Sequence, residues 1–178
     1  MVIHPLFVFV GAQIVQKSPR ENAIIQDLYF DKISKDDIEK AFIKICKYQT
    51  LPYPIFSSKT VKGKPLFVYA KEGSLDSIEI PHYHVNVHKH HIDEVSEDEI
   101  LGDYIEDIIE TVELVSGDFR QKMITTAWAK QESNHIVRKI VATFTVGSGT
   151  YIRSLVHEVG KELGVGGCCV KITRTRIY

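Results

Sequence analysis

Apolar residues recur with helical spacing near the C-terminal end of the chain. Separations of three and four residues place them on one face of a helix, and the members of this stripe are Ile152, Leu155, Val156, Val159 and Leu163. Thr150 is the predicted N-cap, because its hydroxyl oxygen can accept a hydrogen bond from the first turn. Gly164 is the predicted C-cap, because glycine adopts the left-handed conformation that ends many helices. The pattern therefore predicts an amphipathic helix between these two residues.

The segment before this helix has a period of two, which is typical of a strand. Two sets of side chains alternate there: Ile140, Ala142, Phe144 and Val146 with Val141, Thr143 and Thr145. Gly147, Ser148 and Gly149 then predict a short turn into the helix. Unpaired N–H groups and the positive end of the helix dipole converge at such a turn, so it predicts an anion-binding corner.

The rest of the chain alternates between predicted helices and strands. Strands are predicted over residues 6–15 and 78–92, and helices over residues 34–47, about 96–114 and about 118–130. Ser34 is the predicted N-cap of the first helix, with Asp37 three residues later, and Ser96 followed by Glu99 marks the start of the second. Helices mixed with strands that return to one sheet indicate an α+β fold.

Arg153 falls in the first turn of the predicted C-terminal helix. This end of a helix carries partial positive charge, so a cation there is disfavoured unless an anion pairs with it. The apolar setting of Arg153 predicts a buried side chain whose anion comes from elsewhere. The alternative is an ordinary capped helix in which Arg153 extends to solvent.

Charge is distributed unevenly along the 178 residues, although the formal net charge is only −1. Residues 93–113 include ten acidic residues and no lysine or arginine, whereas residues 117–178 include ten lysines or arginines against four acids. Phosphate binding needs a local basic surface rather than a basic average, so the C-terminal part is the predicted nucleic-acid-facing half. The acidic segment is interpreted as a solvated face.

The sequence shows neither a secretory signal nor a membrane span. The apolar residues 5–15 lack a preceding basic region, and no apolar run approaches the roughly 20 residues of a transmembrane helix. Three cysteines provide neither a disulfide framework nor a paired metal spacing. We therefore expect a cytoplasmic protein that is not bound to a membrane.

Alternating histidines occupy one face of the predicted strand over residues 78–92. They are His82, His84, His88 and His90. Such a pattern can bind a metal, but metal ligands usually come from different elements and have supporting partners. We interpret the histidines as the polar face of a half-buried strand and expect no metal.

Three blocks of sequence resemble one enzyme family. The longest is VGSGTYIRSLVHEVGKELGVGGCCVKITRTR at residues 146–176, the second covers residues 49–73 and includes FSSKTVKGKPL and YAKEG, and the third is GDFRQ at residues 117–121. In this order they are similar to the C-terminal part of the catalytic domain of the TruB family of tRNA pseudouridine synthases. The resemblance covers roughly residues 35–178.

The resemblance implies a fold and a reaction. The fold is a mixed, largely antiparallel sheet with flanking helices around an RNA-binding cleft. The reaction isomerises a uridine in the T-arm loop of tRNA: the base is flipped out, its glycosidic bond is broken, and the base is rejoined through carbon. Neither a metal nor a cofactor is implied.

The resemblance also implies roles for particular residues. Arg153 matches the arginine that pairs with the family's nucleophilic aspartate, Tyr151 matches a tyrosine near the base, and Ile172 matches an apolar residue that packs beside the base. The other expected RNA-binding residues are Thr150, Lys59, Lys64, Lys171 and Arg174. Phe56 is a further candidate for the lining of the same cleft.

One family segment has no match in this sequence. The nucleophilic aspartate of the family lies in a GHTGTLDPLATG segment, upstream of all three blocks, and no such segment occurs here. We therefore expect residues 1–178 to be a single, incomplete pseudouridine synthase catalytic domain, without a C-terminal RNA-binding appendage and inactive alone.

Three functional hypotheses follow. In the first, the chain is active when a separately encoded N-terminal portion supplies the aspartate. In the second, it is a non-catalytic tRNA-binding or RNA-chaperone module. In the third, the histidine strand and the acidic helix form a metal-binding or interaction protein with no affinity for tRNA.

Overall fold

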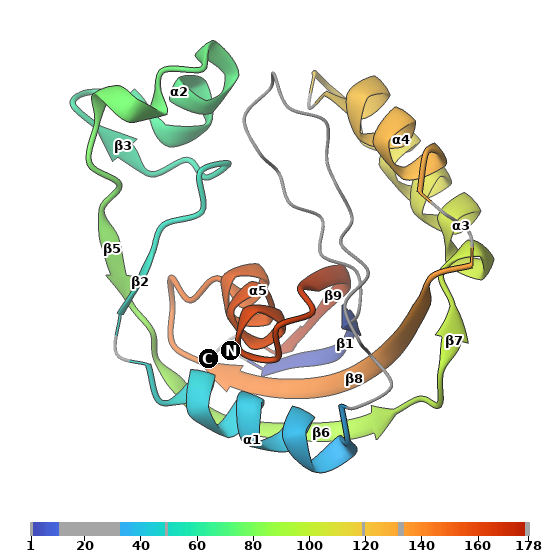
Figure 1. Cartoon of the computed structure of the whole chain (residues 1–178). Coiled ribbons are helices and arrows are strands. Elements are labelled where there is room, and N and C mark those ends of the chain that lie inside the picture. The colour runs from blue at the N-terminus through green and yellow to red at the C-terminus, as the bar shows by residue number, and fades with distance from the viewer. Residues whose placement is uncertain (1, 11–32, 49, 119, 132–133, 177–178) are drawn as a thin grey trace.

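A curved antiparallel sheet forms the centre of the computed structural model (Figure 1). The structure describes residues 2–10, 33–48, 50–118, 120–131 and 134–176, and within this part only the backbone of residues 2–10 and 174–176. The strand order is β6-β8-β1-β9, with bounds of Val87–Val95, Ile136–Val146, Val2–Val10 and Gly167–Arg176. The five helices found in the described ranges and these antiparallel strands confirm the predicted α+β class.

Two helices cover the sheet and enclose the main core. They are α1, Lys35–Cys46, and α5, Ile152–Glu162. The predicted face of β8 is buried at Ile140, Ala142, Phe144 and Val146, which confirms the alternation. Phe144 meets Phe42 of α1 at a ring-centroid distance of 6.0 Å. Because both rings are almost fully buried, each contributes about 1.5–3 kcal/mol of hydrophobic stabilisation.

Helix α1 begins as its sequence predicts. The Asp37 N–H donates to the Ser34 hydroxyl over 3.2 Å, and the Ser34 N–H donates to the Asp37 carboxylate over 3.0 Å, which completes a capping box. The hydrogen bond from the Ser34 side chain lowers the pKa of Asp37. The two polar residues satisfy each other's backbone groups, so the start of α1 depends on local sequence alone.

Helix α5 has the predicted apolar face but a different N-cap. The N-cap is Tyr151, not Thr150, which belongs to the preceding turn, where its N–H donates to the Gly147 carbonyl over 3.3 Å. The C-cap is Leu163, and Gly164 follows it in the left-handed conformation, with φ +75°. The Gly164 and Val165 N–H groups donate to Lys161 and Gly160 carbonyls, which is the Schellman arrangement.

The acidic helix begins later than the sequence predicts. Ser96 does not cap it: the Ser96 N–H donates to the Lys139 carbonyl, and its hydroxyl accepts from the Lys139 N–H, each over 2.9 Å. Residues Glu99–Ile100 then pair with β8 as β7, so α3 spans only Gly102–Glu113. Helix α4, Gln121–Ala129, completes a hairpin with α3, and a small separate core of Leu101, Ile108 and Val137 lies beneath it.

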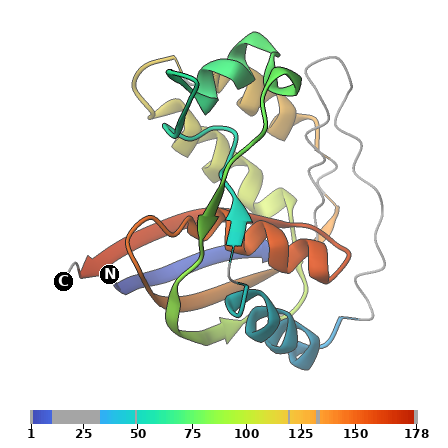
Figure 2. The same ribbon diagram turned by 90° about the vertical axis from the view of Figure 1, so that its left-hand side faces the viewer.

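The predicted histidine strand is two strands in different sheets. Strand β5, His82–His84, pairs with β2, Thr50–Pro52, and the pair leads away from the main sheet (Figure 2). A register shift follows Val87 in β6, and His90 stacks on Phe144 with ring centroids 6.4 Å apart. The prediction of one shared histidine face is therefore wrong. Burial, reinforced by neighbouring His91, lowers the pKa of His90.

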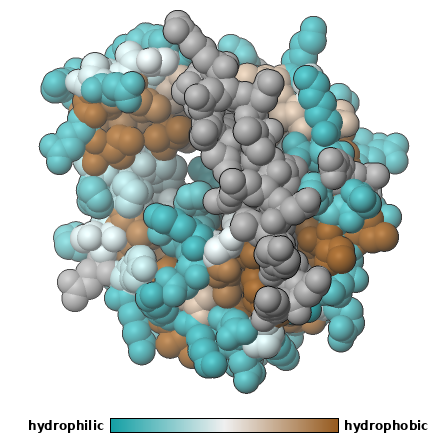
Figure 3. Space-filling model, in the orientation of Figure 1, coloured by the Kyte–Doolittle hydropathy of each residue, from teal (hydrophilic) through white to brown (hydrophobic). Residues whose placement is uncertain are grey.

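The segment between β2 and β5 forms a compact extension. It consists of β3, Thr60–Val61, β4, Lys64–Pro65, helix α2, Leu66–Glu72, and a single 3-10 turn at Leu75–Ser77. Apolar side chains reach the surface over α2 (Figure 3), where Phe56 and Phe67 are 40% and 37% exposed.

The remaining sequence predictions concern the end of the first strand, the cysteines, a metal site and a membrane span. Residues 11–15 of the predicted first strand lie outside the described residues. All three cysteines are free thiols. Within the described ranges, no cluster of three or more His, Cys, Asp or Glu side chains is arranged to hold a metal. No helix in the described part of the chain is long and apolar enough to cross a membrane.

Candidate functional site

The turn between β8 and α5 is fixed by backbone contacts. The Gly147 N–H donates to the Asn86 carbonyl over 2.8 Å, and Gly149 adopts φ +82°, a conformation that glycine accepts without a steric penalty. Among the described residues, no side chain caps the first turn of α5. The donors of this turn are therefore not used by a capping side chain.

Three tyrosines from separate segments pack around the start of α5. Tyr151 lies 5.7 Å from Tyr53 and 5.2 Å from Tyr83, measured between ring centroids, and both contacts are edge-to-face. Tyr53 and Tyr83 are themselves 5.2 Å apart. Such ring pairs contribute about 0.5–1.5 kcal/mol beyond the area that they bury. We call Tyr53, Tyr83 and Tyr151 the tyrosine cluster; it holds the ring of Tyr151 in one place.

Tyr83 is the anchor of the tyrosine cluster. It is only 5% exposed, whereas Tyr53 and Tyr151 are half-buried. Its hydroxyl donates to the Tyr151 carbonyl over a long 3.5 Å. Burial raises the pKa of Tyr83, and hydrogen bonds with the Ser154 side chain and the Tyr151 backbone oppose this rise. The hydroxyl thereby ties β5 to the first turn of α5.

Lys59 and Lys64 lie in different surroundings. The Lys59 ammonium is exposed and lies 5.0 Å from the centre of the Tyr53 ring, which connects it to the tyrosine cluster. Lys64 pairs with Glu72 and lies 4.4 Å from the Tyr69 ring centre. The structure therefore brings Lys59, but not Lys64, to the tyrosine cluster.

The second and third sequence blocks meet in the structure. The Lys71 ammonium donates to the Asp118 carbonyl over 2.8 Å, and the Arg120 guanidinium donates to the Lys71 carbonyl over 3.3 Å. The Arg120 guanidinium also lies 5.6 Å from the centre of the Phe56 ring. These contacts connect α2 to the start of α4 and hold the exposed Phe56 ring beside a cation.

Arg153 is exposed, so the prediction that it is buried is wrong. It follows Ile152, whose side chain faces the core, and the helical rotation directs the next residue away from the core. Among the described residues, no carboxylate forms an ion pair with Arg153. It lies near the Cys169 thiol: burial and Cys168 raise the pKa of Cys169 to about 12, and Arg153 acts against that rise.

The remaining candidates occupy the corner and the neighbouring edge strand. Thr150 is 8% exposed, and its hydroxyl oxygen has no hydrogen-bond partner among the described residues. On β9, Lys171 is exposed and Ile172 is 41% exposed, which is unusual for a large apolar residue on a strand. The side chain of Arg174 lies outside the described residues.

The chain is similar in sequence to known proteins over most of its length. A tRNA pseudouridine synthase B of Lactobacillus gasseri is 30% identical over 129 residues, which are 72% of this chain and 31% of that protein. The protein of the same name from Lactiplantibacillus plantarum is 23% identical over 146 residues, 82% of this chain and 36% of that protein. The chain thus resembles tRNA pseudouridine synthase B. This finding confirms the TruB resemblance that the sequence blocks indicate.

A short stretch carries the strongest similarity to the TruB proteins. Over 30 residues the chain is 60% identical to the tRNA pseudouridine synthase B of Bifidobacterium longum, which is 17% of this chain and 8% of that protein. No family model matches the chain. The chain spans about a third of the length of the L. plantarum and L. gasseri proteins.

The sequence motifs include Tyr151 but give no reason to connect it with Tyr53 or Tyr83. A partial signal exists for Tyr83, which lies on the apolar side of the alternating histidine segment. Nothing local indicates that Tyr53, about a hundred residues before Tyr151, reaches the same corner. The pairing of β2 with β5 brings Tyr53 beside Tyr83, and both rings then meet Tyr151 at the start of α5.

The exposure of Arg153 leads to a stability prediction. Substitution Arg153→Met should leave the melting temperature unchanged within about 2 °C or raise it, because it removes a cation from the positive end of α5. Thermal unfolding followed by circular dichroism measures this, with Lys161→Met in the last turn of α5 as the matched comparison. A fall of 5 °C or more for Arg153→Met alone would mean that Arg153 has a stabilising partner within this chain.

Proposed function

We propose that this chain forms the RNA-facing part of a TruB-like tRNA pseudouridine synthase, with the nucleophilic aspartate supplied from outside these 178 residues. The observation that carries the proposal is Arg153: an exposed guanidinium, beside Tyr151, in a first turn without a side-chain cap. A cation at this end of a helix destabilises the helix by about 0.3–1 kcal/mol. A carboxylate placed against the cation turns this unfavourable interaction into a favourable one. The TruB proteins named above are pseudouridine synthases, which supports the same role.

In this proposal Tyr151 receives the flipped uridine. A base that leaves its stack loses several kcal/mol of stacking and pairing, and a rigid aromatic ring recovers part of it. The ring of Tyr151 is half-exposed and is held from two sides by Tyr53 and Tyr83. It therefore offers a surface that needs little ordering when the base arrives, and we assign the exposed apolar Ile172 side chain of β9 to packing beside the base.

Phosphate contacts in this proposal position the RNA without reading its sequence. Lys59 is exposed beside the tyrosine cluster, and Lys171 is exposed on β9. Arg174 follows on the same strand. At the corner, the buried Thr150 hydroxyl has no hydrogen-bond partner among the described residues, and we assign it to an RNA oxygen. Lys64 contributes less than Lys59, because its ion pair with Glu72 already satisfies the ammonium.

A second candidate function is non-catalytic tRNA binding. It is favoured by the exposure of Lys59 and Lys171, which can contact phosphate whether or not a nucleophile is present. Binding alone would use the same lysines and tyrosines but would need no nucleophile. The two functions differ only in whether product forms once an aspartate segment is present.

The first arm of the test uses the chain alone. An unmodified T-arm stem-loop should bind, with an affinity that falls as salt rises, and no pseudouridine should form because no nucleophile is provided. Lys59→Gln should weaken binding and reduce the salt slope by about 1, whereas Lys40→Gln on α1 should change neither. Absence of binding contradicts both candidate functions, and pseudouridine made by the chain alone contradicts the need for an external aspartate.

The second arm separates catalysis from binding. The part of the Lactobacillus gasseri protein that precedes the matched stretch is fused to this chain, and pseudouridine in the stem-loop is measured by mass spectrometry. We expect product from the fusion and its loss in the Arg153→Met fusion. If the fusion binds RNA and leaves every uridine unchanged, while the intact L. gasseri protein turns over, the non-catalytic function holds instead.

A further inference from the structure

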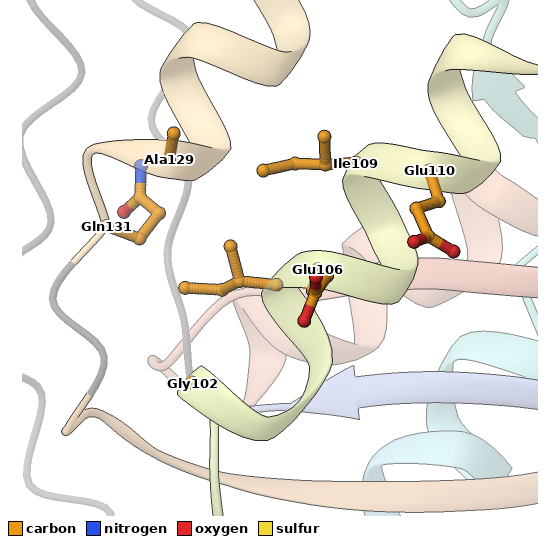
Figure 4. Close-up of a pocket in the computed structure, with 7 residues that line it drawn as sticks. Gly102, Glu106, Ile109, Glu110, Ala129 and Gln131 are labelled. Atoms are coloured by element: carbon orange, nitrogen blue, oxygen red, sulfur yellow. The ribbon is translucent and has the colours of Figure 1, made fainter.

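A surface groove separates the two helices of the α3–α4 hairpin. Its volume is about 600 Å³, and its lining comes from both helices and the residues next to them: Gly102, Ile105, Glu106, Ile109, Glu110, Ala129 and Gln131. Figure 4 shows Ile109 pointing from α3 toward Ala129 at the end of α4, with Gln131 just beyond. The groove belongs to the hairpin, which has its own small core and shares no lining residue with the tyrosine cluster.

The floor of the groove is apolar and has helical spacing. Ile105 and Ile109 lie one turn apart on α3 and are only half-buried. Ala129 adds a small exposed side chain from the opposite helix, so the floor is flat there. Two apolar residues four positions apart, facing a second helix across an open groove, form the kind of surface on which an amphipathic helix lies.

The rim of the groove is negative. Glu106 and Glu110 are exposed, also one turn apart, and α3 carries five acidic residues and no lysine or arginine. No basic residue occupies the last turn of α3, where the helix dipole is negative. Acidic side chains at that end raise the energy of the helix, so a cation bound at the rim relieves repulsion within α3 itself.

Gln131, which lines one end of the groove, has a side-chain oxygen without a hydrogen-bond partner among the described residues. The Gln131 side-chain oxygen is buried and accepts no hydrogen bond there, while its amide nitrogen donates to the Ala127 carbonyl over 2.7 Å. A buried acceptor without a donor costs about 1–3 kcal/mol.

We propose that the α3–α4 groove binds a cationic amphipathic helix of a partner protein. Apolar side chains of that helix lie on Ile105 and Ile109, and its lysines or arginines pair with Glu106 and Glu110. An RNA occupant is disfavoured, because the carboxylates of the rim repel phosphate. This inference does not depend on the proposed pseudouridine synthase function, since it uses none of the residues assigned to RNA.

The test uses a fluorescein-labelled peptide of 18 residues. Its leucines are spaced so that they lie on one face of a helix, and all its other residues are lysines. Fluorescence anisotropy with the whole chain should give one-to-one binding at 150 mM salt. The double variant Glu106→Gln/Glu110→Gln should weaken this binding at least tenfold. The matched variant Asp107→Asn/Glu113→Gln removes the same charge from α3 outside the groove and should change the affinity less than threefold.

Further measurements distinguish a cationic helix from other occupants of the groove, namely an acidic helix and a second copy of this chain. A peptide with glutamate in place of lysine should not bind, and Ile109→Ser should weaken the lysine peptide tenfold if circular dichroism shows the variant folded. If both double variants weaken binding of the lysine peptide equally, the proposal is overturned, because the peptide is then attracted only by the net charge of α3. No binding overturns it too, as does a dimer of the free chain that Ile109→Ser dissociates. Binding of the T-arm stem-loop should be unchanged in all these variants.

Discussion

Gly160→Ala should leave this chain without a stable native state. Gly160 lies inside α5 where the helix crosses the start of β9, and a Cβ atom there would sit 2.0 Å from both the Gly166 carbonyl carbon and the Gly167 nitrogen. These are backbone atoms, which cannot rotate away as a side chain does. In an open helix the same change stabilises by about 0.8–1 kcal/mol. Steric overlap with the backbone makes Gly160→Ala destabilising instead. We expect the free energy of unfolding to fall by at least about 3 kcal/mol.

The control for Gly160→Ala is Gly164→Ala, four residues later. Gly164 has φ +75°, but nothing lies within 4 Å of a Cβ added there, so only the cost of the left-handed conformation remains, about 1 kcal/mol. Urea unfolding followed by circular dichroism compares the two variants with the parent chain. If Gly160→Ala unfolds at the same urea concentration as Gly164→Ala or a higher one, the close approach of α5 to β9 is refuted.

Tyr83→Ala should destabilise the chain and disorder the corner at the same time. Truncating a buried aromatic side chain costs about 3–5 kcal/mol, and Tyr83 is also the residue that ties β5 to the first turn of α5. Tyr83→Phe keeps the ring and removes only the hydroxyl, so it should cost about 0.5–1.5 kcal/mol. Tyr53→Ala should cost less than Tyr83→Ala, because Tyr53 is only half-buried.

Two measurements test the role of Tyr83. Urea unfolding gives the order of stability, and binding of the T-arm stem-loop reports on the position of Tyr151. Tyr83→Phe should bind RNA as the parent chain does, whereas Tyr83→Leu, which fills the space without a ring, should bind more weakly even at temperatures where it is fully folded. Equal binding by Tyr83→Phe and Tyr83→Leu would show that the tyrosine cluster does not position Tyr151 for RNA.

Local sequence was sufficient for elements whose signals lie within a few residues. The capping box of α1 needs only Ser34 and Asp37, and the apolar stripe of α5 follows from helical periodicity. The same kind of reasoning failed at Ser96, where the residues are also compatible with a helix start. There Lys139 of the neighbouring strand β8 forms hydrogen bonds with the backbone and the side chain of Ser96. This tertiary contact overrides the local signal for a helix.

The candidate site also has some features that local sequence determines and others that depend on tertiary contacts. The sequence by itself determined the family resemblance, the strand, turn and helix of the corner, and the presence of Arg153 and Tyr151 in its first turn, because all of these depend on neighbouring residues. Only the tertiary structure decided that Tyr53 and Tyr83 surround Tyr151 and that His90 stacks on Phe144. These depend on strand pairing and register between distant segments, which periodicity within one segment does not encode.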